Sequence, residues 1–220
     1  MPTSRATTVD LTSHAAFSGN LRLLAERGEP KRYAKGVILI QEGDQGDMIY
    51  IIVEGRLRAY TSSADDEREF HYGTFGPGEY VGEMGLDGGR RSANVITLEP
   101  SLCVKVGRPT LERFIADHPG FAFELLGKVI GRARSATQQA QMLALENVYG
   151  RLRWLLESQA VLRPDGVRVV ERRLTHLEIA SRLGCSREMV SRVMKEVERR
   201  GLVHETARGL VLNSELPRDL

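Results

Sequence analysis

The chain has 220 residues, of which 41% are hydrophobic and 27% charged, and a formal net charge of +2, an ordinary globular composition for one large domain or two small ones. No apolar run approaches the roughly 20 residues that span a bilayer, and residues 1–17 lack the apolar core of a secretory signal, so we expect a cytoplasmic protein that does not enter a membrane. From residue 150 onward the chain carries 14 Lys and Arg against 10 Asp and Glu, and this basic third slightly favours a nucleic-acid partner.

Short apolar runs separated by glycine-bearing turns fill the chain between residues 31 and 106. Such regular spacing of short strands predicts an all-β barrel or sandwich. The runs are residues 37–40 (VILI), 49–53 (IYIIV), 80–84 (YVGEM) and 102–106 (LCVKV).

One stretch of this zone, residues 82–93 with the sequence GEMGLDGGRRSA, mixes glycines with charged side chains. Glycine lets main-chain N–H groups approach an anion, arginine offers a forked set of donors that suits phosphate, and Glu83 could accept hydrogen bonds from sugar hydroxyls. This combination would suit a nucleotide. From these residues alone, a glycine-rich turn with solvated charges is an equally good interpretation.

A long glycine-poor segment, rich in alanine and leucine, extends from about residue 121 to 158 and predicts a helix. Six of its residues recur at spacings of three and four, which is typical of a helix that packs along a partner helix. The alternative is a helix that lies on its own barrel. We expect an interruption at residues 147–150. The six recurring residues are Val129, Ala133, Ala136, Ala140, Leu143 and Asn147.

A helix-turn-helix is predicted by the residues that begin and end its two helices. Thr175 and Glu178 form a capping box for the first helix, and Gly184 makes the turn. Ser186 caps the second helix and Gly201 ends it. The small apolar core of the pair comprises Ile179, Ala180, Leu183, Val190, Val193 and Val197.

Short strands are expected on both sides of this motif. Residues 163–170, RPDGVRVV, predict a turn that leads into a short strand, and residues 202–212, LVHETARGLVL, predict two strands that form a wing around residues 207–209.

Charged side chains near the start of the second helix are candidates for reading DNA. Arg187, Glu188 and Arg192 can point outward while the valines point inward. Arginine suits the O6 and N7 atoms of guanine and glutamate can accept from the cytosine amino group, so we expect guanine-containing sites. Ser186 and Lys195 are candidates for phosphate contacts. The alternative for any one of these residues is a solvated helix face.

Two separate stretches resemble the same protein family. Residues 184–203 resemble the recognition helix of the cyclic AMP receptor protein/fumarate-nitrate reductase regulator (CRP/FNR) family of bacterial transcription regulators, and residues 82–93 resemble its phosphate-binding cassette. Residues 41–60 are similar to a strand pair of that family with Gly-Asp at the turn. The resemblance covers residues 30–213 in the right order.

The resemblance implies an α+β fold with three parts: a cyclic-nucleotide-binding jelly roll at residues 1–120, a dimerisation helix and hinge at 121–149, and a winged helix-turn-helix at 150–220. It further implies a homodimer that binds palindromic double-stranded DNA with TGTGA-like half-sites. The loop Arg163–Gly166 resembles the loop that family members present to RNA polymerase, which points to an activator.

The resemblance also assigns roles in the cassette. It implies that Gly82 and Glu83 face the ribose of a cyclic nucleotide, that Glu83 takes the 2′-hydroxyl, and that Arg91 and Ser92 bind the phosphate. Arg90 is expected to be a solvated neighbour, and cyclic AMP is the default ligand.

The sequence departs from the family pattern in two places. The loop at residues 87–90 is shorter than in the cyclic AMP receptor itself, and the adenine-contacting pair of the dimerisation helix corresponds to Ala136 and Thr137. One adenine contact is therefore missing or moved, and only Thr137 remains a candidate. Two alternatives stay open: a regulator that responds to cyclic di-GMP, or a ligand-independent DNA-binding protein in which Glu83 and Arg91 form a salt bridge that braces a vestigial pocket.

Enzymatic turnover of cyclic nucleotides has little support, because the sequence shows neither a metal-binding cluster nor a nucleophile paired with a base. Cys103 and Cys185 stand apart from each other and from any Cys/His motif, and both are expected to be buried reduced thiols. We expect neither a metal nor a covalent cofactor.

Overall fold

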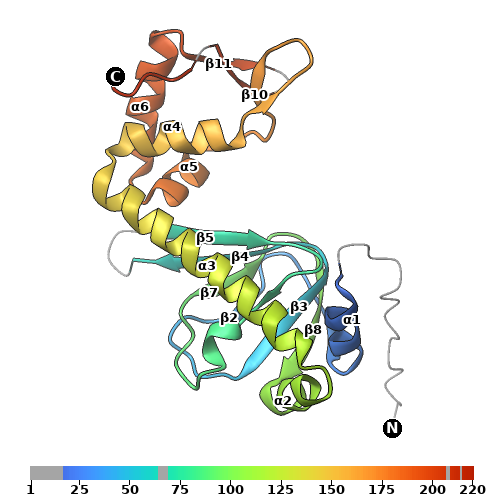
Figure 1. The fold of residues 1–220 in the computed structure, drawn as a ribbon. Coiled ribbons are helices and arrows are strands. Elements are labelled where there is room, and N and C mark those ends of the chain that lie inside the picture. The colour runs from blue at the N-terminus through green and yellow to red at the C-terminus, as the bar shows by residue number, and fades with distance from the viewer. Residues whose placement is uncertain (1–16, 64–68, 207–208, 214) are drawn as a thin grey trace. The chain divides into compact units, whose positions relative to one another are not determined.

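The computed structural model describes residues 17–63, 69–206, 209–213 and 215–220. The chain divides into two compact units. The first comprises the residues up to Thr61 together with Tyr72–Arg132, and the second comprises Ser62–His71 with Ala133–Leu220 (Figure 1). Within the described part of the chain, no helix is both long enough and apolar enough to cross a membrane.

Two four-stranded sheets make up the β-rich part of the chain, and their paired strands run antiparallel. The first sheet has the order β1 (Glu29–Tyr33), β8 (Ser101–Gly107), β3 (Met48–Glu54) and β6 (Tyr80–Val81). The second has the order β2 (Ile38–Ile40), β7 (Asn94–Thr97), β4 (Leu57–Ser62) and β5 (Glu69–Phe75).

Three of the four predicted strands are confirmed. The strand predicted at residues 80–84 is shorter than expected and comprises only its first two residues. Strand β6 ends at Val81 because Gly82 adopts a left-handed conformation with φ of 93°. The next residues, Glu83–Gly85, form a single 3-10 turn, η1, instead of continuing the strand. This turn carries Glu83 out of the sheet and into the candidate ligand site.

Strand β3 is buried on both of its faces, which explains why its sequence is continuously apolar. Ile49 and Ile51 pack in a cluster with helices α1 (Gly19–Glu26) and α2 (Arg108–Asp117), whereas Ile52 packs in a second cluster with side chains of the other sheet. The strand therefore lies between the helices and the interior of the β structure.

The predicted long helix is interrupted where expected. Helix α3 (Gly120–Leu145) is followed by α4 (Val148–Gln159), and Asn147 caps α4 by accepting a 2.8 Å hydrogen bond from the Gly150 amide. Asn147 is therefore a helix cap and not the last member of the apolar seam. The other five seam residues, between 129 and 143, are all exposed, and Phe121 is the buried residue of α3.

The second unit contains the predicted winged helix-turn-helix, with helices α5 (His176–Leu183) and α6 (Arg187–Arg199). Val190, Met194 and Val197 of α6 are buried, whereas the predicted core residue Val193 is only partly buried. The RPDG turn joins two strands and not one, and residues 207–208 at the tip of the wing lie outside the described residues. The sheet of this unit has the order β11 (Val203–Thr206), β12 (Gly209–Leu212), β10 (Arg168–Val170) and β9 (Val161–Leu162).

Candidate functional site

Arg91 is a buried cation at the centre of the cassette, with 8% of its surface exposed. Its Nη1 donates to the Gly82 carbonyl at 2.6 Å, and its Nη2 donates to the Met48 carbonyl at 2.9 Å. Among the described residues, no carboxylate forms an ion pair with it. The positive charge is thus held by dipoles alone, which leaves it able to bind an anion.

Glycines surround the Arg91 guanidinium because there is no room for a side chain. A Cβ on Gly46 would lie 2.8 Å from Nη2 of Arg91, and a Cβ on Gly85 would lie 2.9 Å from Nη1 and 2.5 Å from the Gly46 carbonyl. We expected the glycines to bring main-chain N–H groups close to an anion. That role stays a prediction, and the structure adds that Gly46 and Gly85 allow the backbone to approach the arginine.

Gly82→Ala is expected to lower the free energy of unfolding by about 2–3 kcal/mol. The new Cβ would lie 2.7 Å from the Met48 carbonyl oxygen, on a residue with φ of 93°. Gly88→Ala is the matched control, since Gly88 also has a positive φ but nothing within 4 Å of its Cβ position, and about 1 kcal/mol is expected there. Urea denaturation measures both losses. Equal losses would show that the contact with Met48 costs nothing.

Glu83 is buried in the turn η1 and forms an ion pair with Arg132 of helix α3. Arg132 also donates to the Tyr80 carbonyl, and its guanidinium lies 4.7 Å from the Phe75 ring centroid and 5.3 Å from that of Tyr80. Burial raises the pKa of the Tyr80 hydroxyl to about 12, although the charge of Arg132 acts to lower it. The hydroxyl therefore stays neutral beside this ion pair.

The salt bridge between Glu83 and Arg91, which only the ligand-independent alternative predicted, is wrong. Arg132 forms the ion pair with the Glu83 carboxylate instead. Arg132 was not predicted from the sequence because it lies beside the apolar seam of the long helix, where a charged residue is expected to face solvent.

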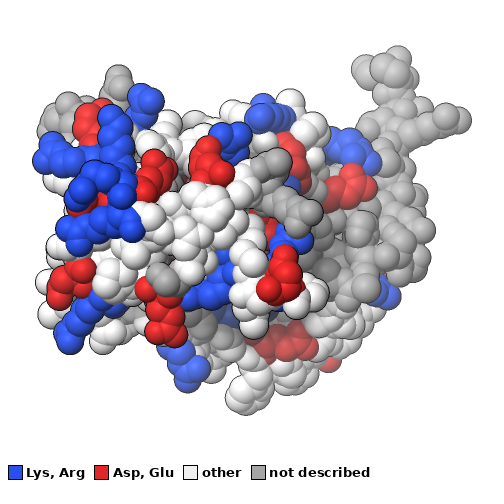
Figure 2. Space-filling model, turned by 90° about the horizontal axis from the view of Figure 1, so that it is seen from above, with Lys and Arg blue, Asp and Glu red and all other residues white. Residues whose placement is uncertain are grey.

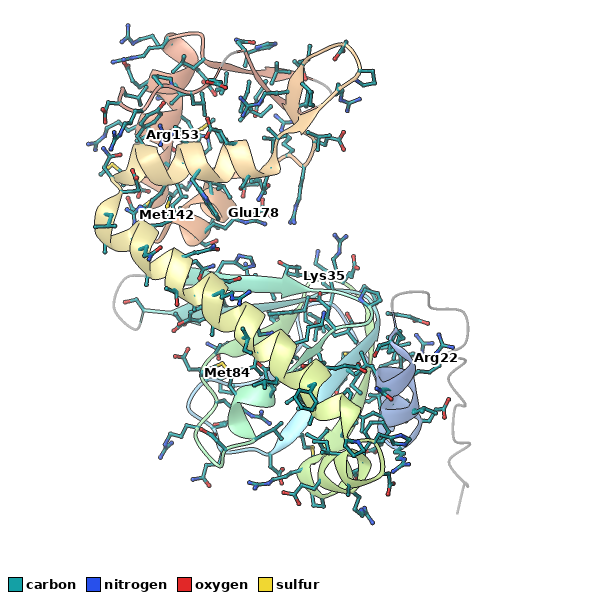
Figure 3. The ribbon with its side chains drawn as sticks, viewed as in Figure 1. Arg22, Lys35, Met84, Met142, Arg153 and Glu178 are labelled. Carbon is teal, nitrogen blue, oxygen red and sulfur yellow. The ribbon has the colours of Figure 1, made fainter. Side chains whose placement is uncertain are left out.

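Two further cassette residues make contacts of their own. Arg90 is exposed but is not simply solvated, since its Nη1 donates to the Gly43 carbonyl at 2.8 Å. The Ser92 hydroxyl is exposed and donates to the sulfur of Met84 at 3.4 Å. Figure 3 labels Met84, which is 60% exposed. The structure thus joins Arg91 to Gly82, whereas Glu83 and Ser92 each contact another residue.

Thr137 belongs to the second unit, in the later part of α3. It is exposed, and its hydroxyl donates to the Ala133 carbonyl one turn earlier at 3.0 Å. The role of Thr137 in binding a base remains a prediction.

The start of the helix-turn-helix is fixed by the predicted capping box. The Thr175 hydroxyl accepts from the Glu178 amide at 3.2 Å, and the Glu178 carboxylate accepts from the Thr175 amide at 2.8 Å. Burial acts to raise the pKa of Glu178, but the hydrogen bonds from Thr175 and the charge of Arg172 outweigh it, so the pKa is lowered. The turn that follows uses Gly184 with φ of 64°, as predicted.

The proposed reading residues Arg187, Glu188, Arg192 and Lys195 are all exposed on α6. Ser186 is only half-buried, and its hydroxyl accepts from the Met189 amide at 3.2 Å as the helix cap. Figure 2 shows Lys and Arg side chains gathered on part of the surface with acidic side chains among them. Exposure of this kind suits contact with DNA.

Among the described residues, no group of three or more His, Cys, Asp or Glu side chains is placed so that it could hold a metal ion. Both cysteines are free. Cys103 is buried, and burial raises the pKa of its thiol to about 12. Cys185 is only partly buried, contrary to expectation, and burial also raises its pKa.

Comparison with known proteins identifies the two domains in which the candidate sites lie. The model of the cyclic nucleotide-binding domain matches residues 30–118, and that of the Crp-like helix-turn-helix domain matches residues 151–215. The CRP-like protein Clp of Xanthomonas campestris pv. campestris is 28% identical over 222 residues, which cover 96% of this chain and 94% of Clp.

Solved structures agree with these matches. The cyclic di-GMP responsive global regulator CLP of Xanthomonas campestris is 26% identical and has a TM-score of 0.76, covering 89% of this chain and 99% of that one. The catabolite activator protein of Thermus thermophilus is 27% identical with a TM-score of 0.53 and 92% coverage of both chains. The order of the parts is the one that the sequence predicted: a cyclic nucleotide-binding domain, a long helix and a helix-turn-helix domain. The chain belongs to the CRP/FNR family of transcription regulators and not to a family of enzymes.

Proposed function

We propose that this regulator is a homodimer whose binding to palindromic DNA is controlled by a cyclic nucleotide in the segment Gly82–Ser92. The observation that carries the proposal is Arg91, a buried cation that no carboxylate of the described residues neutralises. A cyclic phosphate supplies the missing negative charge, and the hydroxyl of Ser92 lies next to it in the chain as a second donor. Glu83 is the acceptor for a ribose hydroxyl.

Cyclic AMP is the default ligand of the proposal and cyclic di-GMP the alternative. Both carry a phosphate for Arg91 and a purine. The family pattern favours cyclic AMP, whereas the similar regulator of Xanthomonas campestris responds to cyclic di-GMP. Thr137 is the proposed contact to the base. The phosphate contact is therefore better supported than the identity of the base.

Helix α3 supplies the proposed dimer interface. Its seam of small and apolar side chains from Val129 to Leu143 is exposed in the single chain, and Leu126 beside it is 51% exposed. Such a stripe is buried when two copies of the helix pack together. A two-fold dimer would present two α6 helices to successive half-sites, for which we propose TGTGA-like sequences.

The exposed side chains of α6 are the proposed DNA contacts. Arg187, Glu188 and Arg192 would read base edges, and Ser186 and Lys195 would contact phosphates. As a regulator that acts on DNA, the protein would work in the cytoplasm.

The hairpin β9–β10 is the proposed contact to RNA polymerase. Its turn is closed by a 2.9 Å hydrogen bond from the Gly166 amide to the Arg163 carbonyl, and residues 164–167 are exposed. An activator would present this turn to the polymerase, in keeping with the family resemblance.

A ligand-independent regulator is the second candidate, and one observation favours it. Glu83 is neutralised by Arg132, and both terminal nitrogens of Arg91 already donate to carbonyls. Polar groups that satisfy one another are stable without a ligand, so this arrangement of side chains does not require one.

Titration calorimetry with cyclic AMP, cyclic GMP and cyclic di-GMP tests the proposal. We expect micromolar or tighter binding of one of them, weakened at least tenfold by Arg91→Ala, because a charge-assisted hydrogen bond contributes about 1.5–3 kcal/mol. Ser92→Ala is the milder second variant, since Ser92 is exposed and its hydroxyl donates to the sulfur of Met84, which is itself exposed. Arg90→Ala is the matched control and is expected to bind normally. No heat from any ligand, with DNA binding intact, would favour the ligand-independent regulator.

A further inference from the structure

His176, the first residue of helix α5, forms a hydrogen bond to the recognition helix. Its Nδ1 lies 2.9 Å from Oγ of Ser191 on α6, and the tautomer of the ring sets which atom donates. Both side chains are half-buried. This bond joins the two helices of the motif directly.

Ser191 lies on the same side of α6 as the proposed reading residues. It follows Arg187 by four positions and Glu188 by three, and these spacings place side chains on one helix face. The hydrogen bond to His176 is therefore made at the edge of the reading face. A hydrogen bond is directional, whereas the apolar contacts between the helices are not.

Apolar packing alone leaves this corner of the motif incompletely filled. A cavity of about 30 Å³ lies beside His176 and is also lined by Ile179, Met194 and Leu210. Since α6 could shift slightly into this space, a directional contact is needed to fix its rotation.

We propose that His176 is a positioning residue, which holds α6 through Ser191 in the orientation required to read bases and does not itself contact DNA. This inference rests on the proposed reading of DNA by α6. Loss of the bond should then weaken binding to specific DNA and leave binding to random DNA unchanged, because phosphate contacts tolerate a small rotation better than base contacts do.

The test begins with DNA that the wild-type full-length protein selects from a random library. Affinity for the selected sequence and for random DNA is then measured for His176→Ala, His176→Asn and His176→Gln. Asparagine places a polar atom near the position of Nδ1, whereas glutamine places one near Nε2. We expect about tenfold weaker specific binding for the alanine and glutamine variants and near-normal binding for the asparagine variant.

A double-mutant cycle identifies the partner. Ser191→Ala is expected to cause the same loss as His176→Ala, and the double variant should be no worse than either single one. Ser158→Ala is the matched control, because the Ser158 hydroxyl donates to a carbonyl of its own helix at 2.9 Å. It should leave specific binding unchanged.

Three outcomes would overturn the inference. Unchanged specific binding for His176→Ala would show that the bond positions nothing. An equal loss on random DNA, with a smaller salt dependence, would make His176 a phosphate contact instead. If the wild-type protein selected no sequence at all, the proposed reading of DNA by α6 would fail and the inference with it, a result distinguishable from the first two.

Discussion

Replacing Arg132 with alanine is expected to lower the free energy of unfolding by about 3–5 kcal/mol, because the change leaves a buried carboxylate without its partner. The Glu83 side chain is only 6% exposed, and that of Arg132 is 26% exposed. Arg132 also packs on the rings of Phe75 and Tyr80, so the variant loses cation–π contacts as well. Urea denaturation followed by circular dichroism measures the loss.

A second substitution separates the charge from the packing. Adding Glu83→Gln to the Arg132→Ala background removes the unpaired charge, so this double variant should regain most of the lost stability. Arg108→Ala is the matched control, since Arg108 forms an exposed ion pair with Glu112 in the same unit, and exposed pairs contribute little. A loss no greater for Arg132→Ala than for Arg108→Ala would refute the structural role of the buried pair.

The same ion pair sets a condition for any ligand. A ribose hydroxyl that binds Glu83 must share the carboxylate with Arg132, and Arg132 lies on α3, the helix of the proposed dimer interface. A ligand shifts the regulator between two states only by its difference in affinity for them. A change from 1:99 to 99:1 requires about 5.5 kcal/mol of such difference.

The DNA-binding motif was predictable in detail because its signals are local. A capping box, a glycine turn and a serine cap each involve residues within four positions of one another, and all three are confirmed at Thr175, Gly184 and Ser186. The exception is the core of α6, where Met194 is buried in place of Val193. Spacing alone does not decide which of two adjacent residues at the edge of an apolar helix face is buried.

The candidate ligand site was predictable only in part, because its contacts join distant segments. The family resemblance placed Glu83 and Arg91 in the cassette, but the carbonyl that binds Nη2 of Arg91 belongs to Met48, and the partner of Glu83 is Arg132. Strand β1 was missed for a different reason. Four of its five residues are exposed at the edge of a sheet, so the strand lacks apolar alternation.

Arg187→Ala is expected to weaken binding to the selected DNA by about 1–3 kcal/mol, which corresponds to roughly 5–160-fold, and to relax the preference at one guanine. Lys195→Ala should instead weaken binding to all sequences alike and flatten the plot of log K against log salt by about one unit. Both residues are exposed on α6. Fluorescence anisotropy with selected and random DNA, at several salt concentrations, distinguishes the two effects.

Arg199→Ala is the control for a general loss of positive charge on the same helix. Glu196 already accepts hydrogen bonds from Arg199 at 2.8 and 2.6 Å, and these bonds together with those from Arg200 lower the pKa of Glu196 to about 2. Removing Arg199 takes one positive charge from α6 and leaves Glu196 paired with Arg200. Because Arg199 lies at the opposite end of α6 from Arg187, its removal should leave the preference for the selected sequence unchanged. If Arg187→Ala and Lys195→Ala lost affinity equally on random DNA, the division into reading and phosphate contacts would be wrong. If Arg187→Ala alone lost affinity only for the selected sequence, this result would establish that α6 reads bases through its first turn. The reason is that loss of a base contact lowers the affinity for one sequence and leaves the attraction to phosphates intact.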